Sequence, residues 1–170
     1  MLAGADFEPS NNAYDWLGPG IYFWEANPRR GLEFMREKAG REGFDPADAF
    51  VVGAIIDLGS CLDLTTSASI ELVKSAYDEF VVATTRAGNL MPENTDDLLR
   101  RHLDCAVIRH LHKILESAES TPLQSVKGVF TEGPAIYPGA GIREKTHVQI
   151  AILDPACIKG VFRVPSGHLT

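Results

Sequence analysis

The stretch that decides the fold is residues 15–25, with the sequence DWLGPGIYFWE. Its second half, residues 20–24, is rich in β-branched and aromatic residues, which predicts a short strand. Gly18 and Gly20 permit another backbone or a ligand to approach closely. The residue types alone are as consistent with an aromatic anchor of the core as with a binding site.

The next segments carry helix and strand signals in turn. Asn27 and Pro28 suit an N-cap and a first helical position, which predicts a helix over residues 28–38. A nearly continuous apolar run over residues 49–58 predicts a central strand buried on both faces. A second helix is expected after Thr66 or Ser67, from apolar residues spaced by three or four.

The second half of the chain is expected to contain one helix and then strands. An acidic first turn predicts that the helix begins near residues 94–97. Its buried stripe is expected to comprise Leu99, Leu103, Val107, Leu111 and Ile114 or Leu115. Strands are predicted over residues 126–131, 146–153 and 158–164. A loop rich in Pro and Gly over residues 132–145 separates the first two, and loops of this length are more often functional than idle.

Length and composition point to a globular α+β protein. The chain has 170 residues, of which 45% are hydrophobic and 23% charged. These values fit one domain over residues 1–170. The net charge of −7 argues against a broad nucleic-acid surface, which needs clustered Lys and Arg.

The apolar runs and the cysteines predict a cytoplasmic protein with no membrane partner. The longest apolar runs are far shorter than the roughly 18 residues of a membrane helix. Residues 1–8 show no basic segment followed by an apolar one, so no signal peptide is expected. The three cysteines are widely spaced, which favours reduced thiols over a disulfide framework.

No metal is expected. His102 and Cys105 stand three residues apart on a predicted helix, but a third ligand at matching spacing is missing. Structural zinc sites use four ligands and catalytic sites three. Solvated or capping histidines are the preferred interpretation.

A second unusual segment runs from residue 132 to residue 149. Its loop leads into a strand that carries Glu144, Lys145, His147 and Gln149 at or near its start. Strand alternation places His147 and Gln149 on one face. The alternative to a functional site is an edge strand whose polar residues face solvent.

The two unusual segments together resemble an ADP-ribosyltransferase. Residues 18–23, GPGIYF, are similar to the G-x-G-I-Y-F signature of the poly(ADP-ribose) polymerase and diphtheria-toxin-like branch. The resemblance implies two small packed β-sheets that form an NAD cleft, with helices at the flanks. It also implies that Tyr22 stacks on the nicotinamide ring and that Phe34 stands near the second aromatic of the family. A positively charged ring gains from an aromatic face.

The resemblance extends to the late strand and supplies further candidate residues. Gln149 falls where the family carries its glutamate, and Glu144 is close enough in sequence to supply a carboxylate, with Glu132 a weaker candidate. Glutamine can bind a ribose hydroxyl but brings no negative charge to an oxocarbenium-like transition state. The catalytic candidates are therefore Tyr22, Glu144 and Gln149. The residues expected to bind NAD are Gly20, Ile21, Tyr22, Phe34 and His147.

The family's first strand, which carries His or Arg followed by Gly, has no counterpart before Tyr22. The chain starts with residues 1–4, MLAG, where that strand and its helix should already have ended. Three explanations stay open. The chain is truncated relative to the family, it is a degenerate member of the family, or another residue replaces the missing one. Loss of this strand would weaken NAD affinity and expose a sheet edge.

The resemblance implies transfer of ADP-ribose from NAD, as substrate, to a macromolecular acceptor, either protein or nucleic acid. A bacterial toxin or phage-defence setting is expected, with an antitoxin or inhibitor protein as a possible partner. Hydrolysis of NAD, with water as the acceptor, is a second hypothesis. A third is a non-catalytic module that binds a nucleotide or a protein.

Overall fold

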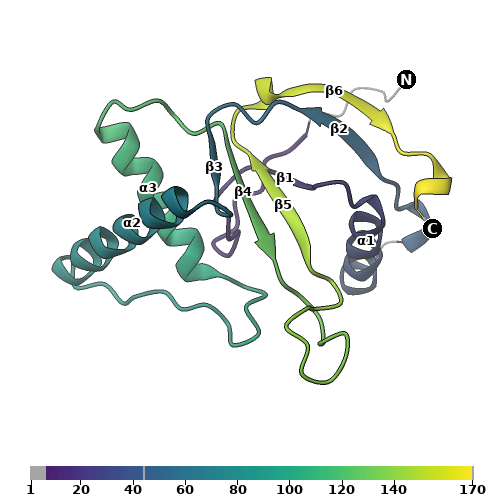
Figure 1. Ribbon diagram of the computed structural model, residues 1–170, viewed down its shortest axis with the longest axis horizontal. Helices are drawn as coiled ribbons and strands as arrows, with labels where there is room; N and C mark the ends of the chain where they lie inside the picture. The colour runs from purple at the N-terminus through teal and green to yellow at the C-terminus, as the bar shows by residue number, and fades with distance from the viewer. Residues whose placement is uncertain (1–6, 44, 170) are drawn as a thin grey trace.

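The computed structural model describes residues 7–43 and 45–169, and these residues adopt an α+β fold (Figure 1). The expectation about a missing first strand concerns residues 1–4, which lie outside the described residues. The main elements are, in chain order, β1 (Ile21–Trp24), α1 (Pro28–Glu42), β2 (Val52–Ile56), β3 (Cys61–Asp63), α2 (Ser67–Arg86), α3 (His102–Ser117), β4 (Ser125–Phe130), β5 (His147–Ile152) and β6 (Ile158–Arg163).

The strands form two small sheets. The larger has the order β1-β5-β4-β3, in which β3 and β4 are parallel and the other pairs antiparallel. The smaller sheet contains β2 and β6, which are antiparallel. The strand β5 is therefore central, so the alternative of a solvent-facing edge strand is wrong: His147 is buried at the start of β5.

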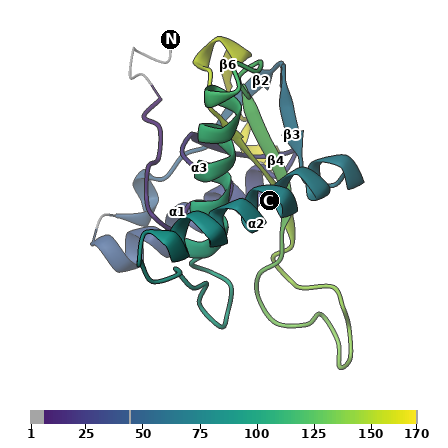
Figure 2. The same cartoon turned by 90° about the vertical axis from the view of Figure 1, so that its left-hand side faces the viewer.

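Helices cover one face of the larger sheet. In Figure 2, α2 crosses in front of α3, and both lie on the same side of that sheet. Their core includes Leu17, Ile108, Leu111, Val126 and Ala151, all nearly inaccessible to solvent. A second core of Ile21, Ile150, Ile152 and Cys157 lies on the opposite face, where Ile56 and Leu58 pack against it. The helix α1 lies beside β1, away from the other two (Figure 1).

Local capping signals place the first two helices. The Asn27 side chain accepts a hydrogen bond from the Arg30 amide, and α1 ends at a left-handed Gly43. The Thr66 side chain accepts from the Ser69 amide at the start of α2. The predicted strand at residues 20–24 and both helix starts are confirmed, although α1 continues four residues beyond the predicted end.

The predicted start of the third helix is wrong. This helix begins at His102, and the preceding residues form a tight loop in which the Thr95 amide donates to the Arg100 carbonyl. Asn94 caps α3 from a distance, because its Oδ1 accepts from the amides of Leu103 and Asp104. Within the expected stripe, Leu103, Val107 and Leu111 face the core, but Leu99 is exposed.

The prediction of a central strand over residues 49–58 is also wrong. The strand β2 pairs only with β6 in the described part of the chain, and the Ile55 side chain is 62% exposed. The other apolar residues of β2 face the space between the two sheets, and the strand is not buried on both faces. The three later strands and the loop between β4 and β5 lie where predicted, within one residue at each start and at each end.

The described residues contain no helix that is both long and apolar enough to span a bilayer. They also contain no group of three or more His, Cys, Asp and Glu residues that could hold a metal ion.

Candidate functional site

A cleft of about 700 Å³ lies between the two sheets and α1. The sheets contribute residues from β1, β2, β5 and β6, and α1 contributes Gly31 and Met35. The aromatic residues that line it include Phe7, Tyr22, Phe23, Trp24, Phe50 and Phe162. Its size lies within the range of small-molecule sites, and its lining is mostly apolar with a few polar groups, as in most ligand pockets.

The acidic residue among the described residues of this lining is Glu25. It follows β1 directly, and its carboxylate accepts a hydrogen bond of 2.9 Å from Nζ of Lys127 on β4. This contact raises the pKa of Lys127, so the lysine keeps its charge and the pair holds the Glu25 carboxylate in place. His168, in the last turn of the described chain, also lines the cleft.

Two of the predicted site residues, His147 and Gln149, lie on the opposite face of the larger sheet. Nε1 of Trp16 donates to Oε1 of Gln149 at 2.6 Å, and Nε2 of Gln149 lies 2.9 Å from Nε2 of His147. Nδ1 of His147 lies 2.6 Å from the Lys145 carbonyl, which can only accept. The proton of the neutral imidazole is therefore on Nδ1, and Nε2 accepts from Gln149. Burial lowers the pKa of His147.

Other side chains of the protein cover the face of the larger sheet on which His147 and Gln149 lie. Trp16 packs against Gly128, where a Cβ atom would lie 2.5 Å from the indole ring. The Arg101 guanidinium lies 4.6 Å from the ring centroid of Trp16 and 4.8 Å from that of Phe130. His147 and Gln149 are thus brought together, but beneath Trp16 rather than in the open cleft.

Tyr22 is held by its hydroxyl group. The hydroxyl donates to the Gly18 carbonyl at 2.8 Å and accepts from the Leu17 amide at 3.2 Å. The ring packs against the core beneath α3, and burial raises the pKa of Tyr22 far above its ordinary value. Tyr22 also belongs to the lining of the cleft, so it lies between the core and the cleft.

The remaining motif residues divide between packing and aromatic contacts. A Cβ atom at Gly20 would lie 2.8 Å from the Ile152 carbonyl, so the close approach expected there is to β5. Ile21 is buried in the second core. Phe34 on α1 contacts Trp24 at 5.1 Å between ring centroids, and Trp24 contacts His147 at 6.2 Å. Phe34 and His147 therefore join one aromatic group through Trp24.

The two loop glutamates differ sharply in their surroundings. Glu144 is exposed in the loop, where its amide donates to the Pro134 carbonyl. Glu132 is only 16% exposed and accepts a hydrogen bond of 2.9 Å from Arg30, a residue 4% exposed. Glu37 lies 3.4 Å from Arg30 and 2.8 Å from Lys145. Lys145 is at the C-terminal end of the loop, so the ion pairs connect both ends of the loop to α1. Glu132 therefore anchors the loop, and Glu144 lies apart from the other site residues.

The loop itself projects from the body of the protein in both views (Figures 1 and 2). Its ends are joined by a hydrogen bond from the Lys145 amide to the Glu132 carbonyl. Three apolar residues near its tip, Ile136, Tyr137 and Ile142, are about half exposed. A projecting loop with exposed apolar residues is suited to contact another macromolecule.

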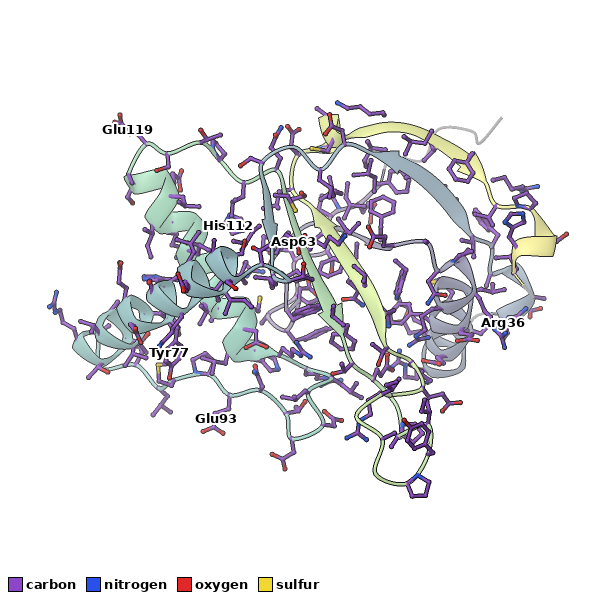
Figure 3. The ribbon with its side chains drawn as sticks, in the orientation of Figure 1. Arg36, Asp63, Tyr77, Glu93, His112 and Glu119 are labelled. Atoms are coloured by element: carbon purple, nitrogen blue, oxygen red, sulfur yellow. The ribbon has the colours of Figure 1, made fainter. Side chains whose placement is uncertain are left out.

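His102 and Cys105 have separate surroundings. The His102 ring contacts Tyr14 edge-to-face, and the buried Cys105 accepts a hydrogen bond from Arg109. Figure 3 shows α3 with His112 labelled, well away from Arg36 on α1.

Comparisons with protein-family models, with curated proteins and with solved structures found no match to this chain. The site therefore rests on its own geometry. Sequence reasoning missed Glu25 as a member of the cleft, although Glu25 directly follows the aromatic strand. Its partner Lys127 is 102 residues away, and no local pattern reveals that contact.

Proposed function

We propose that the chain binds NAD in the cleft between its sheets and transfers ADP-ribose to a macromolecular acceptor. The observation that supports this most is the position of the Gly-Pro-Gly-Ile-Tyr-Phe segment. Its last three residues begin β1, and β1 contributes Tyr22, Phe23 and Trp24 to the lining of a cleft of ligand size between two small sheets. Such a cleft suits a flat, charged nicotinamide ring.

Glu25 is the carboxylate we assign to the reaction. As the glycosidic bond breaks, its electron pair leaves with nicotinamide, and positive charge develops on the ribose. A fixed carboxylate stabilises that charge. An acceptor nucleophile then bonds to the ribose carbon and loses its proton to solvent. Glu144 remains the second carboxylate candidate, because the loop that carries it would meet the acceptor.

The projecting loop is the part we assign to the acceptor. Its apolar side chains Ile136, Tyr137 and Ile142 are exposed, whereas its two ends are held by the Arg30 and Lys145 ion pairs. This arrangement fixes the loop at its base and leaves its tip free for contact. Tyr137→Ser is expected to lower transfer without changing hydrolysis of NAD by water.

The test is nicotinamide release from NAD by the purified chain, with and without cell extract, in wild type and in Glu25→Gln, Glu144→Gln and Glu33→Gln. Release only with extract supports transfer, and the labelled product identifies the acceptor. Release without extract supports hydrolysis. Loss in Glu25→Gln but not in Glu33→Gln supports Glu25, since Glu33 is an exposed partner of Arg29 on α1. No release in either condition contradicts both enzymatic proposals.

A non-catalytic nucleotide-binding module is the second candidate, and the state of Gln149 favours it. Gln149 stands at the position of the family's glutamate, and both ends of its amide are already engaged by Trp16 and His147. Titration of NAD into the chain by calorimetry separates the candidates. Binding without nicotinamide release supports the module, and binding with release excludes it.

A further inference from the structure

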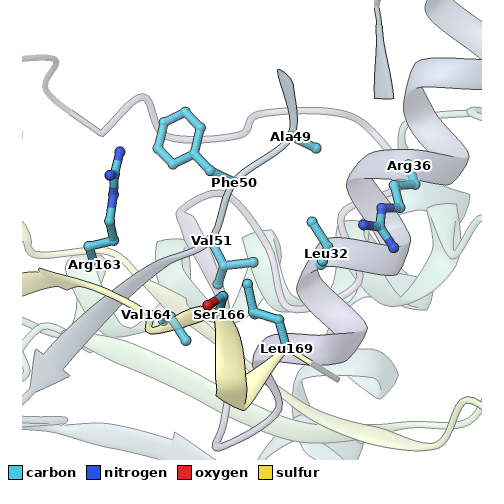
Figure 4. A pocket seen from close by; sticks show the side chains of 9 residues that line it. All are labelled: Leu32, Arg36, Ala49, Phe50, Val51, Arg163, Val164, Ser166 and Leu169. Atoms are coloured by element: carbon cyan, nitrogen blue, oxygen red, sulfur yellow. The ribbon is translucent and has the colours of Figure 1, made fainter. Parts of the chain in front are cut away.

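A second cavity, of about 340 Å³, adjoins the cleft (Figure 4). The two share Phe50, Val51 and Val164 in their linings. Arg36 on α1 and Arg163 at the end of β6 lie on opposite sides of the second cavity, with Phe50 and Val51 between them (Figure 4). The cavity thus combines two cationic groups with an apolar middle.

Neither arginine is neutralised by a described side chain. The glutamates of α1 have other partners: Glu33 pairs with Arg29, Glu37 with Arg30 and Lys145, and Glu42 with Lys38. No ion pair within the described part of the chain involves Arg36 or Arg163. Two positive groups at one small cavity, in a chain of net charge −7, create a local site for an anion.

The residues between the arginines favour a flat apolar group. Phe50 is 62% exposed, which is unusual for a phenylalanine and leaves its ring available for stacking. The buried Leu32 and the partly buried Leu169 complete the apolar part of the lining. A ligand that fits both parts carries an aromatic ring and one or more anionic groups. A nucleotide has this combination, and guanidinium groups are well suited to phosphate.

We infer that this second cavity binds the phosphate-bearing adenylate part of a nucleotide, through Arg36 and Arg163. The inference rests on the proposed function, because a dinucleotide that occupies both cavities would pass the residues they share. The nicotinamide end would then lie in the larger cleft beside β1. The adenylate end would lie against Phe50, with phosphate oxygens at the two guanidinium groups.

The test uses AMP and adenosine as probes in calorimetric titrations of the full chain. Wild type is expected to bind AMP at least about tenfold more tightly than adenosine, with a difference that shrinks as salt is added. Arg36→Gln and Arg163→Gln are each expected to weaken AMP binding about tenfold and to leave adenosine binding unchanged. Arg41→Gln is the matched control, because Arg41 is an exposed residue of α1 outside the cavity lining.

Three outcomes would overturn the inference. They are equal affinity for AMP and adenosine, unchanged AMP binding in either variant of the cavity, and an equal loss in Arg41→Gln. The failure of the proposed function gives a different result. AMP lacks nicotinamide, so its binding is measured apart from the reaction. A chain that binds AMP but releases no nicotinamide from NAD would refute the transferase and leave the phosphate site standing.

Discussion

The Nε2 atoms of Gln149 and His147 lie 2.9 Å apart, and the glutamine donates a hydrogen bond to the imidazole. This bond is the middle of a chain that runs from the Trp16 indole to the Lys145 carbonyl. Each donor in the chain meets an acceptor, so the direction of every bond is fixed. The hydrogen bond between Gln149 and His147 therefore fixes the orientation of both side chains on one buried face of the larger sheet. It also fixes the tautomer of His147.

Gln149→Glu is expected to raise the pKa of His147. In wild type, burial lowers this pKa, and the neighbouring amide favours the neutral ring. A carboxylate at position 149 would still accept from Trp16, and it would favour the imidazolium form. NMR titration of the His147 ring in both proteins measures the change. Gln149→Met, which carries no charge, is the control and is expected to leave the pKa low.

The same substitution is expected to reverse the contribution of His147 to stability against pH. In wild type the folded pKa lies below the unfolded value of about 6.5, so stability falls as the pH falls below that value. In Gln149→Glu the folded pKa of His147 is expected to lie above the unfolded value. The stabilising contribution of His147 is then complete below about pH 6.5 and is lost as the pH rises through the raised folded pKa. Urea unfolding from pH 5 to pH 8 tests this sign. His112, whose pKa burial also lowers, contributes equally to both proteins.

Glu132→Gln is expected to destabilise the fold by about 3 kcal/mol, because it leaves the charge of Arg30 buried with a weaker set of partners. Arg30 is 4% exposed, its Nε atom has no hydrogen-bond partner among the described residues, and Glu37 is the more distant partner at 3.4 Å. Chemical denaturation measures the loss.

Glu33→Gln is the control for this substitution. It breaks an exposed ion pair on the same helix and is expected to cost less than about 0.5 kcal/mol. Equal losses in the two variants would contradict the role of Glu132 as a buried partner.

The elements that could be predicted are those with local signals. Asn27 and Pro28 define the start of α1 through contacts within one turn, and Thr66 does the same for α2. The alternation in β5 correctly placed His147 and Gln149 on one face, because a strand has a period of two wherever it lies in a sheet.

The features that could not be predicted depend on distant partners. Asn94 caps α3 from nine residues away, so the local acidic turn gave the wrong helix start. The three-residue strand β3 is too short to show a period and depends on its pairing with β4. The predicted site was incomplete for the same reason. Trp16 contacts Gln149 across 133 residues of sequence, and Glu25 contacts Lys127 across 102.

Gly128→Ala is expected to destabilise the fold by about 1–3 kcal/mol through overpacking. An added Cβ atom would lie 2.5 Å from Trp16 and 3.3 Å from Leu17, and both side chains are buried. The variant is expected to move the indole and to change the tryptophan fluorescence spectrum. Gly40→Ala on α1 is the control, since an added Cβ there meets nothing within 4 Å. It is expected to stabilise the helix by up to about 1 kcal/mol.

Tyr22→Phe separates the two roles of Tyr22. The hydroxyl holds residues 17 and 18 by two hydrogen bonds, and its loss is expected to cost about 1–2 kcal/mol of unfolding free energy. The aromatic ring remains, so NAD binding and nicotinamide release are expected to persist at a temperature well below the unfolding midpoint. Tyr22→Ala removes the ring as well, and the cavity it creates is expected to cost about 3–5 kcal/mol. If Tyr22→Phe abolishes release while its circular dichroism and unfolding curve show a folded protein, the hydroxyl takes part in the reaction and the structural role assigned to it is wrong.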